Sequence, residues 1–240
     1  MVAIITGTIS PDRRMNQLAV TDTEERLKQY TDALEFLISE KVFSKIVFCD
    51  NSAYAVEQLQ FLEDLAAGNG IRLELLSFQG DSAQCVRHGK GYGEGEILEY
   101  VFSNSELLRN ESFFVKITGR LKVVNIREIC RRLKTDKIYF NIPNRTIREY
   151  YDTRIYAMPV EIFRQFFLSA YSRVWDDRGI YLEKVYTRVL LQNRLTVSNF
   201  PQYPRITGIG GSTGLKYEYT EWKCKIKDLV SLLGGYLVHE

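Results

Sequence analysis

A short basic stretch with dense glycine, residues 86–95 (VRHGKGYGEG), is the first candidate for ligand chemistry. Glycine costs roughly 0.5–1 kcal/mol relative to alanine in regular structure, so chains accept it where the backbone must turn sharply or approach a ligand. The basic residues of this stretch can neutralise a diphosphate, and Glu94 or Glu96 can accept hydrogen bonds from sugar hydroxyls. A surface loop with solvated charges is the alternative. We expect a turn here that opens a helix.

A second polar cluster follows an apolar run at residues 45–49 (KIVFC). Asp50, Asn51 and Ser52 come directly after it. A carboxylate at this position can bind a ribose or the edge of a base. Capping of the next helix by Asn51 or Ser52 is the alternative, and it does not exclude binding.

A third cluster ends the apolar run 113–117 (FFVKI), where Lys116 and Arg120 flank Thr118. An ammonium group inside an apolar strand is costly to bury without a charged partner. A bound phosphate, or the carboxylate of Asp152, would supply that partner. We therefore favour a functional role for this cluster.

Acidic residues gather at two later points in the sequence. Asp152 and Arg154 stand at the start of another apolar run, while Asp176, Asp177 and Glu183 flank the start of a late predicted helix. Two adjacent aspartates either bind a divalent cation or form an exposed polar turn.

The elements that position these clusters follow from apolar periodicity. Strands are predicted at 2–6, 45–49, 71–78, 113–117, 137–141, 153–158 and 196–200, with helices from Thr23, at 56–65, after the glycine-rich stretch, from Pro159 and at 180–191. Alternating strands and helices are typical of a parallel sheet. We predict an α/β fold with a Rossmann-type, mixed and mostly parallel sheet flanked by helices. Ligands of such sheets bind at the carboxyl edge of the strands.

Composition narrows the class of protein. The 240 residues include 32 basic and 30 acidic ones, a balance too even for non-specific nucleic-acid binding. The four cysteines form no CxxC pair, which disfavours a zinc site and indicates a reducing, cytoplasmic setting. Two histidines leave few ways to build a catalytic triad. No segment reaches the roughly 18 apolar residues that a membrane-spanning helix needs.

Standard nucleotide fingerprints are absent. Neither the glycine-rich stretch nor residues 208–214 (GIGGSTG) has the GxGxxG spacing after a strand, and there is no Walker A sequence. Kinase-like phosphoryl transfer and nicotinamide chemistry are therefore disfavoured. Without repeats or low-complexity linkers, we expect one domain over 1–240, with 215–240 as a possible C-terminal appendage.

Four patterns in this order and spacing resemble bacterial glycosyltransferases of the GT-A fold that build capsule and O-antigen polysaccharides. They are KGYGEGEILEY, FFVKITGRL, YYDTRIYAMPVEIF and IYLEKVY, within a similarity that runs from about Ile4 to about Gly214. The resemblance implies a GT-A-like sheet and contacts to a nucleotide-sugar donor. The expected donor-binding residues are Thr6, Gly7, Asp50, Asn51, Lys90, Tyr92, Glu94, Lys116, Thr118, Arg120, Asp152 and Arg154.

The sequence departs from this family at the tip of the fourth strand. An Asp-x-Asp motif there normally holds Mn²⁺ or Mg²⁺ against the diphosphate, whereas residues 116–120 read KITGR. Cationic side chains can also stabilise a departing diphosphate. We predict an enzyme without a metal cofactor, in which Lys116 and Arg120 replace the ion. Mn²⁺ or Mg²⁺ is the alternative, with Asp152 and Asp177 as ligands.

An inverting enzyme of this family needs a general base near the start of a late helix, which implies Asp177 or Glu183. A retaining enzyme needs no such base. The leading hypothesis is transfer of a hexose from a UDP- or GDP-sugar to a saccharide acceptor, which we expect to be lipid-linked. The basic, aromatic segment 217–227 either lies on the anionic inner face of the plasma membrane, where such acceptors reside, or forms a helix packed on the domain. The alternatives are a sugar-phosphate nucleotidyltransferase and a non-catalytic nucleotide- or carbohydrate-binding module.

Overall fold

The computed structural model describes the chain except for residues 13, 15–18, 142–149, 211–213, 215 and 233–240. Parts of two segments considered above therefore lie outside the described residues: the glycine run at 208–214 and the C-terminal appendage at 215–240.

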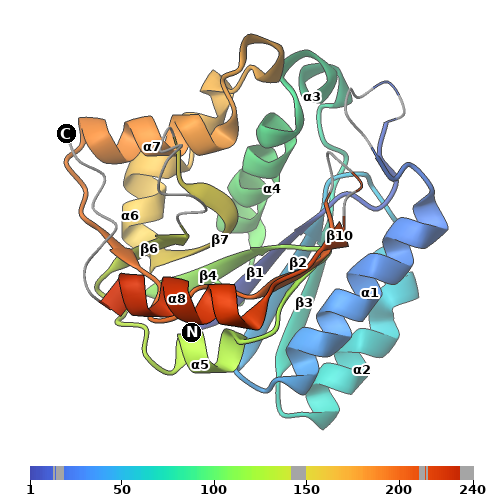
Figure 1. The fold of residues 1–240 in the computed structure, drawn as a ribbon. Coiled ribbons are helices and arrows are strands. Elements are labelled where there is room, and N and C mark those ends of the chain that lie inside the picture. Colours follow the sequence, from blue (N-terminus) through green and yellow to red (C-terminus); the bar gives the residue numbers. More distant parts are fainter. Residues whose placement is uncertain (13, 15–18, 142–149, 211–213, 215, 233–240) are drawn as a thin grey trace.

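A seven-stranded sheet with the order β3-β2-β1-β4-β7-β6-β8 forms the centre of the molecule (Figure 1). Among the described strands of this sheet, β7 is antiparallel to both neighbours and the others share one direction. The predicted mixed, mostly parallel sheet is confirmed. The strands are β1 (Val2–Gly7), β2 (Lys45–Asp50), β3 (Arg72–Ser77), β4 (Phe113–Thr118), β6 (Ile138–Asn141), β7 (Asp152–Pro159) and β8 (Val197–Asn199).

Helices cover both faces of this sheet. α1 and α2 lie on one face, and α4, α6 and α7 lie on the other (Figure 1). The helices are α1 (Thr23–Ser39), α2 (Gln60–Gly68), α3 (Ser82–His88), α4 (Lys90–Asn104), α5 (Ile126–Cys130), α6 (Val160–Ile162), α7 (Leu182–Gln192) and α8 (Glu221–Leu232). A π-helical turn, Phe163–Phe167, continues α6, and a 3₁₀ turn, Ala170–Arg173, follows it.

The alternation of side chains along β1 explains the two layers. Successive residues of a strand point to opposite faces. Val2 and Ile4 join the core beneath α4 and α7, whereas Ala3 and Ile5 join the core beneath α1 and α2. A strand buried on both faces is mostly apolar, which is why residues 2–5 of β1 form a continuous apolar run.

A second, three-stranded sheet has the order β10-β9-β5 and is antiparallel. Its strands are β5 (Leu121–Val123), β9 (Ile206–Ile209) and β10 (Lys216–Tyr217). β5 follows β4 after a turn through Gly119 and Arg120, so this small sheet continues from the carboxyl edge of the central one.

The glycine-rich stretch differs from its prediction. It is helical on both sides of Gly89 (φ 103°), as the end of α3 and the first turns of α4, rather than one extended turn. A β-carbon on Gly95 would lie 2.0 Å from Cβ of Tyr171, and one on Gly91 would lie 2.8 Å from Cβ of Leu182. The glycines therefore allow α4 to pack closely against the 3₁₀ turn and the start of α7.

Candidate functional site

A cleft of about 620 Å³ lies at the carboxyl ends of β1, β2 and β4. The first turns of α4, the start of α7 and the start of β7 close its second side. Because β7 runs antiparallel to β4, its first residues meet the last residues of the neighbouring strands at one edge. Ligands of open α/β sheets bind at this edge.

Basic side chains line one end of the cleft: Lys90 at the start of α4, Arg120 after β4 and Arg26 from α1. Arg26 donates to the carbonyl oxygens of Thr8 (2.7 Å) and Val20 (3.0 Å), and Arg120 donates to Oε1 of Gln29 (2.9 Å). Both guanidinium groups are buried, at 4% and 8% exposure for Arg26 and Arg120 respectively. Within the described part of the chain, neither forms an ion pair with a carboxylate.

The electrostatics of Lys90 show how concentrated this positive charge is. Burial, followed by the charges of Arg120 and Arg26, lowers the pKa of Lys90 to about 8. Asp176 opposes the shift. Neighbouring cations that destabilise one another in this way would be stabilised by a multiply charged anion.

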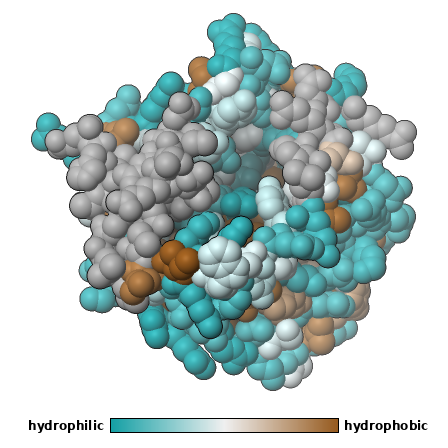
Figure 2. All heavy atoms as spheres, viewed as in Figure 1, coloured by the Kyte–Doolittle hydropathy of each residue, from teal (hydrophilic) through white to brown (hydrophobic). Residues whose placement is uncertain are grey.

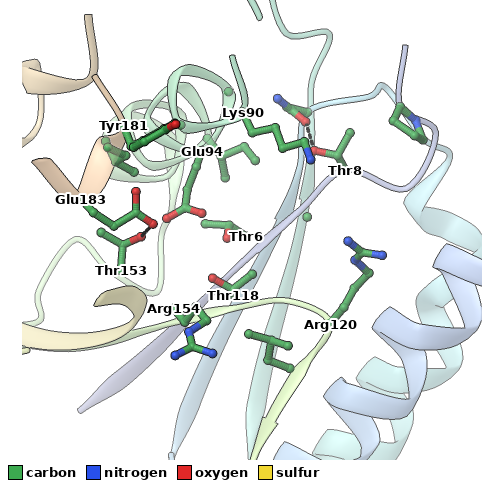
Figure 3. Close-up of a pocket in the computed structure, with 18 of the residues that line it drawn as sticks. Thr6, Thr8, Lys90, Glu94, Thr118, Arg120, Thr153, Arg154, Tyr181 and Glu183 are labelled. Atoms are coloured by element: carbon green, nitrogen blue, oxygen red, sulfur yellow. Dashed lines mark hydrogen bonds between the residues drawn. The ribbon is translucent and has the colours of Figure 1, made fainter. Parts of the chain in front are cut away.

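Carboxylates occupy the opposite side of the cleft. Glu94 from α4 and Glu183 from α7 extend toward each other, with Thr153 of β7 beside them (Figure 3). The Thr153 hydroxyl donates to Oε1 of Glu183 at 3.0 Å. Burial, and next the charge of Glu94, raise the pKa of Glu183. Among the residues described, no lysine or arginine pairs with Glu183, which suits it to accept a proton.

Lys116 lies beneath these carboxylates and is fully buried. Its ammonium group donates to Oε1 of Glu94 (2.5 Å), Oγ1 of Thr118 (3.0 Å) and the carbonyl oxygen of Thr153 (2.9 Å). These three bonds use all three of its N–H donors. The predicted charged partner exists, but it is Glu94 rather than a phosphate or Asp152. Lys116 therefore positions the carboxylate side of the cleft and does not face its interior.

The two predicted donor-binding residues at the end of β2, Asp50 and Asn51, have different roles. Asp50 is fully buried, and its carboxylate accepts hydrogen bonds from the backbone of Ile9 (2.6 Å), Ser52 (2.8 Å) and Tyr54 (3.2 Å). It joins the loops that follow β1 and β2 and does not line the cleft, contrary to its predicted role in donor binding. Asn51 does line it.

Asp176, rather than Asp177, reaches the cleft wall. Its Oδ2 accepts the backbone N–H of Lys90 at 2.9 Å, so it caps the start of α4. Burial raises the pKa of Asp176, and the hydrogen bond from Lys90 opposes that rise. Asp177 is exposed and outside the lining, so the geometry leaves Glu183 as the better-placed of the two predicted bases.

Asp152 and Arg154 both line the cleft and bind each other. Nε of Arg154 lies 2.9 Å from Oδ1 of Asp152, and Nη2 lies 2.5 Å from Oδ2. Asn141 donates to the same carboxylate at 3.0 Å. The Arg154 guanidinium stacks 4.7 Å from the ring of Tyr217, which brings the small sheet to the edge of the cleft.

Of the remaining predicted donor-binding residues, three line the cleft and one does not. Thr6, Gly7 and Thr118 line the cleft at the ends of β1 and β4. Tyr92 does not: its ring packs against His88 (5.1 Å between centroids) and Tyr171 (5.0 Å) on the far side of α4.

Sequence reasoning did not identify two lining residues of α1, Arg26 and Tyr30. They occupy the buried face of this helix together with Ala33, Leu34 and Leu37. A charged residue at an apolar position of a helix is the signal that could have revealed Arg26, because burial of such a group requires polar partners. Tyr150 and Tyr181, at the cleft mouth, carried no comparable signal.

No group of three or more histidine, cysteine, aspartate or glutamate side chains among the described residues is placed to hold a metal ion. The metal-independent mechanism stays a prediction.

Comparison with known proteins does not identify a family for this chain. No protein-family model matches the sequence, and no curated protein matches it. The structure is similar to the nucleoside-diphosphate-sugar pyrophosphorylase from Vibrio cholerae RC9, with a TM-score of 0.46 and 10% identity over 83% of this chain and 91% of that one. It is also similar to HddC from Yersinia pseudotuberculosis, with a TM-score of 0.40 and 9% identity over 69% and 79% of the two chains. Likeness at this level does not indicate a reaction.

Proposed function

We propose that this protein is a glycosyltransferase that moves a hexose from a UDP- or GDP-sugar to a saccharide acceptor. The observation that carries the proposal is the division of the cleft: Lys90, Arg26 and Arg120 at one end, Glu94 and Glu183 at the other. A nucleoside diphosphate sugar has the matching division, with a polyanionic diphosphate joined to a neutral, hydroxyl-rich ring.

The cationic end has the chemistry to bind the diphosphate and stabilise it as it leaves. Two buried guanidinium groups and an ammonium group offer charge-assisted hydrogen bonds, which are stronger than neutral ones. Negative charge grows on the diphosphate as the bond to the sugar breaks, and fixed cations stabilise that charge. In this proposal Arg26, Arg120 and Lys90 perform the task first expected of Lys116 and Arg120.

The carboxylate end has the chemistry to activate the acceptor. In an inverting reaction, the acceptor oxygen bonds to the anomeric carbon of the donor, the bond from that carbon to the phosphate oxygen breaks, and the acceptor proton passes to a base. Glu183 is the proposed base, because its raised pKa strengthens it as a proton acceptor. Glu94, held by Lys116, is positioned to accept hydrogen bonds from sugar hydroxyls.

A sugar-phosphate nucleotidyltransferase would bind the same class of ligand, and one of the structures compared above is a nucleoside-diphosphate-sugar pyrophosphorylase. Such enzymes usually carry a glycine-rich run directly after the first strand, where this chain has Gly7 followed by TISPD. The products separate the two reactions. A glycosyltransferase releases nucleoside diphosphate, whereas a pyrophosphorylase supplied with pyrophosphate releases nucleoside triphosphate and sugar 1-phosphate.

The test begins with thermal stabilisation by a panel of UDP- and GDP-sugars, with and without EDTA. The stabilising donor is then incubated with saccharide acceptors, and released nucleoside diphosphate is measured. We expect stabilisation that survives chelation, and nucleoside diphosphate release that depends on acceptor. Triphosphate formation from pyrophosphate would support the nucleotidyltransferase. Donor binding that yields no product with any acceptor or with pyrophosphate would support a binding module.

A further inference from the structure

Helix α8 (Glu221–Leu232) presents a row of large apolar side chains to solvent. Trp222, Ile226 and Leu229 are 61%, 54% and 59% exposed. Their spacing of four and three residues places them on one side of the helix. We call these three side chains the α8 ridge. Figure 2 shows hydrophobic (brown) and near-neutral (white) surface along the position of α8.

The opposite side of α8 is fixed to the protein. Arg205 donates to both carboxylate oxygens of Glu221, each at 3.0 Å, and to Oδ2 of Asp228 at 2.9 Å. Asp228 also accepts the backbone N–H of Tyr203 at 2.6 Å, and Cys224 is buried between the two acidic residues. These contacts lock the rotation of the helix about its axis, so the ridge faces outward because of the fold.

Lysines flank the ridge. Lys225 lies on one side of it along the helix surface and Lys223 on the other, and both are exposed. In the described part of the chain neither forms an ion pair, since Glu221 and Asp228 bind Arg205. Lys227, next to Lys223 on the helix surface, stacks on the ring of Tyr203 at 3.9 Å. The outer surface of α8 is thus both apolar and cationic.

The ridge also lies close to the cleft. Tyr217 of β10 lines the cleft and precedes the start of α8 by four residues. The hollow of the cleft and the row along α8 appear on the same face of the molecule (Figure 2). A flat surface that contacts α8 would therefore lie near the cleft mouth.

We propose that the α8 ridge docks on the surface of an anionic lipid bilayer. Helices that lie in a membrane interface combine an apolar side containing Trp or Leu with flanking lysines, and binding grows with apolar area and with attraction to anionic lipids. A second copy of the chain fits less well, because three side chains offer far less than the roughly 800 Å² that each partner of a stable dimer buries. Flanking lysines on both copies would also repel. The inference does not depend on the proposed reaction.

The experiment measures co-flotation of the full chain with vesicles of phosphatidylcholine alone, or of one part phosphatidylglycerol to two parts phosphatidylcholine. We expect binding to the anionic vesicles, at least about tenfold weaker binding to the neutral ones, and a loss of binding in high salt. Trp222 fluorescence should shift to the blue on binding. Equal binding to both vesicle types, or none to either, would overturn the proposal.

Two pairs of variants test whether the α8 ridge and its flanking lysines make the contact with the vesicle. Trp222→Ser/Ile226→Ser/Leu229→Ser should abolish flotation, while Phe61→Ser/Leu65→Ser on α2, which removes exposed apolar side chains elsewhere, should not. Lys223→Glu/Lys225→Glu should weaken binding at least about tenfold, while Lys41→Glu/Arg72→Glu should leave it within about twofold. Circular dichroism confirms folding of each variant. If the wild type is instead a dimer that the ridge variant converts to a monomer, the ridge is a contact between copies and the membrane proposal fails.

Discussion

Nζ of Lys116 lies 2.5 Å from Oε1 of Glu94, and this ion pair joins β4 at the floor of the cleft to α4 at its wall. Lys116 is fully buried, whereas the Glu94 side chain is 21% exposed and reaches the cleft. The buried cation therefore holds a carboxylate at a fixed position where a ligand can meet it.

The first prediction concerns the stability of this pair. Lys116→Met should lower the free energy of unfolding by about 3 kcal/mol, the low end for breaking a buried pair, because Glu94 keeps some contact with solvent. Adding Glu94→Gln to Lys116→Met should recover part of that loss, since the unpaired carboxylate is then gone. Urea unfolding of the two single variants and the double variant measures the coupling. Strictly additive losses would mean that the two side chains do not stabilise each other.

The central strands β1, β2 and β4 were predictable because they are buried on both faces. Such strands are mostly apolar, and the runs at β1, β2 and β4 are visible in the sequence. The position of the polar clusters at the carboxyl edge followed from strand direction alone. The ends of the strands, and with them the sheet edge at which the cleft lies, could be located without knowing any tertiary contact.

The roles of individual polar residues could not be predicted from the pattern of apolar residues. Asp50 and Asn51 are adjacent, yet Asp50 binds the backbone of Ile9 from the loop after β1, and only Asn51 lines the cleft. The partner of Lys116 comes from a helix 22 residues away in the sequence. Such assignments depend on long-range geometry, which periodicity does not encode.

The glycines of α4 give a second prediction. Gly95→Ala should cost about 3 kcal/mol of stability, because the new methyl group overlaps Cβ of Tyr171 and neither backbone can easily retreat. Gly68→Ala in α2 is the matched control: a β-carbon there meets nothing within 4 Å, so we expect a gain of about 0.5–1 kcal/mol. Thermal and urea unfolding of the two variants and the wild type measure these changes in stability. A similar small effect at both positions would show that α4 does not pack against Tyr171 this closely.

The third prediction distinguishes the two carboxylates proposed as the base. Glu183→Gln should lower kcat about 10²–10⁴-fold, the usual contribution of a general base, with little change in donor affinity. In the wild type, kcat should rise with pH through the elevated pKa of Glu183, because the ionised form is the base. Stopped assays of nucleoside diphosphate release over a pH series measure both effects.

Asp177→Asn is the control for that experiment. Asp177 is exposed and does not line the cleft, so its variant should keep kcat within about twofold of the wild type. A large loss in Asp177→Asn together with a small one in Glu183→Gln would reverse the assignment of the base.

The fourth prediction uses the lowered pKa of Lys90, which is about 8. Below this pH the side chain is cationic and can bind a diphosphate; above it the charge is lost. The affinity for UDP should therefore fall about tenfold between about pH 7 and about pH 9. Lys90→Arg should remove most of this dependence, because arginine keeps its charge throughout. Isothermal titration calorimetry gives the comparison, and a wild-type affinity that is flat with pH would contradict a contact between Lys90 and the diphosphate.

The same pKa has the opposite effect on stability without ligand. In the unfolded chain Lys90 has its ordinary pKa of about 10.4, whereas in the folded protein the pKa is about 8. Between these values the unfolded state binds more protons, so the free energy of unfolding should rise with pH across this window. Lys90→Met should lack this contribution, so the difference in unfolding free energy between wild type and variant should change with pH there. A saturating nucleoside diphosphate should reduce the change, because the bound anion raises the pKa of Lys90 toward its ordinary value.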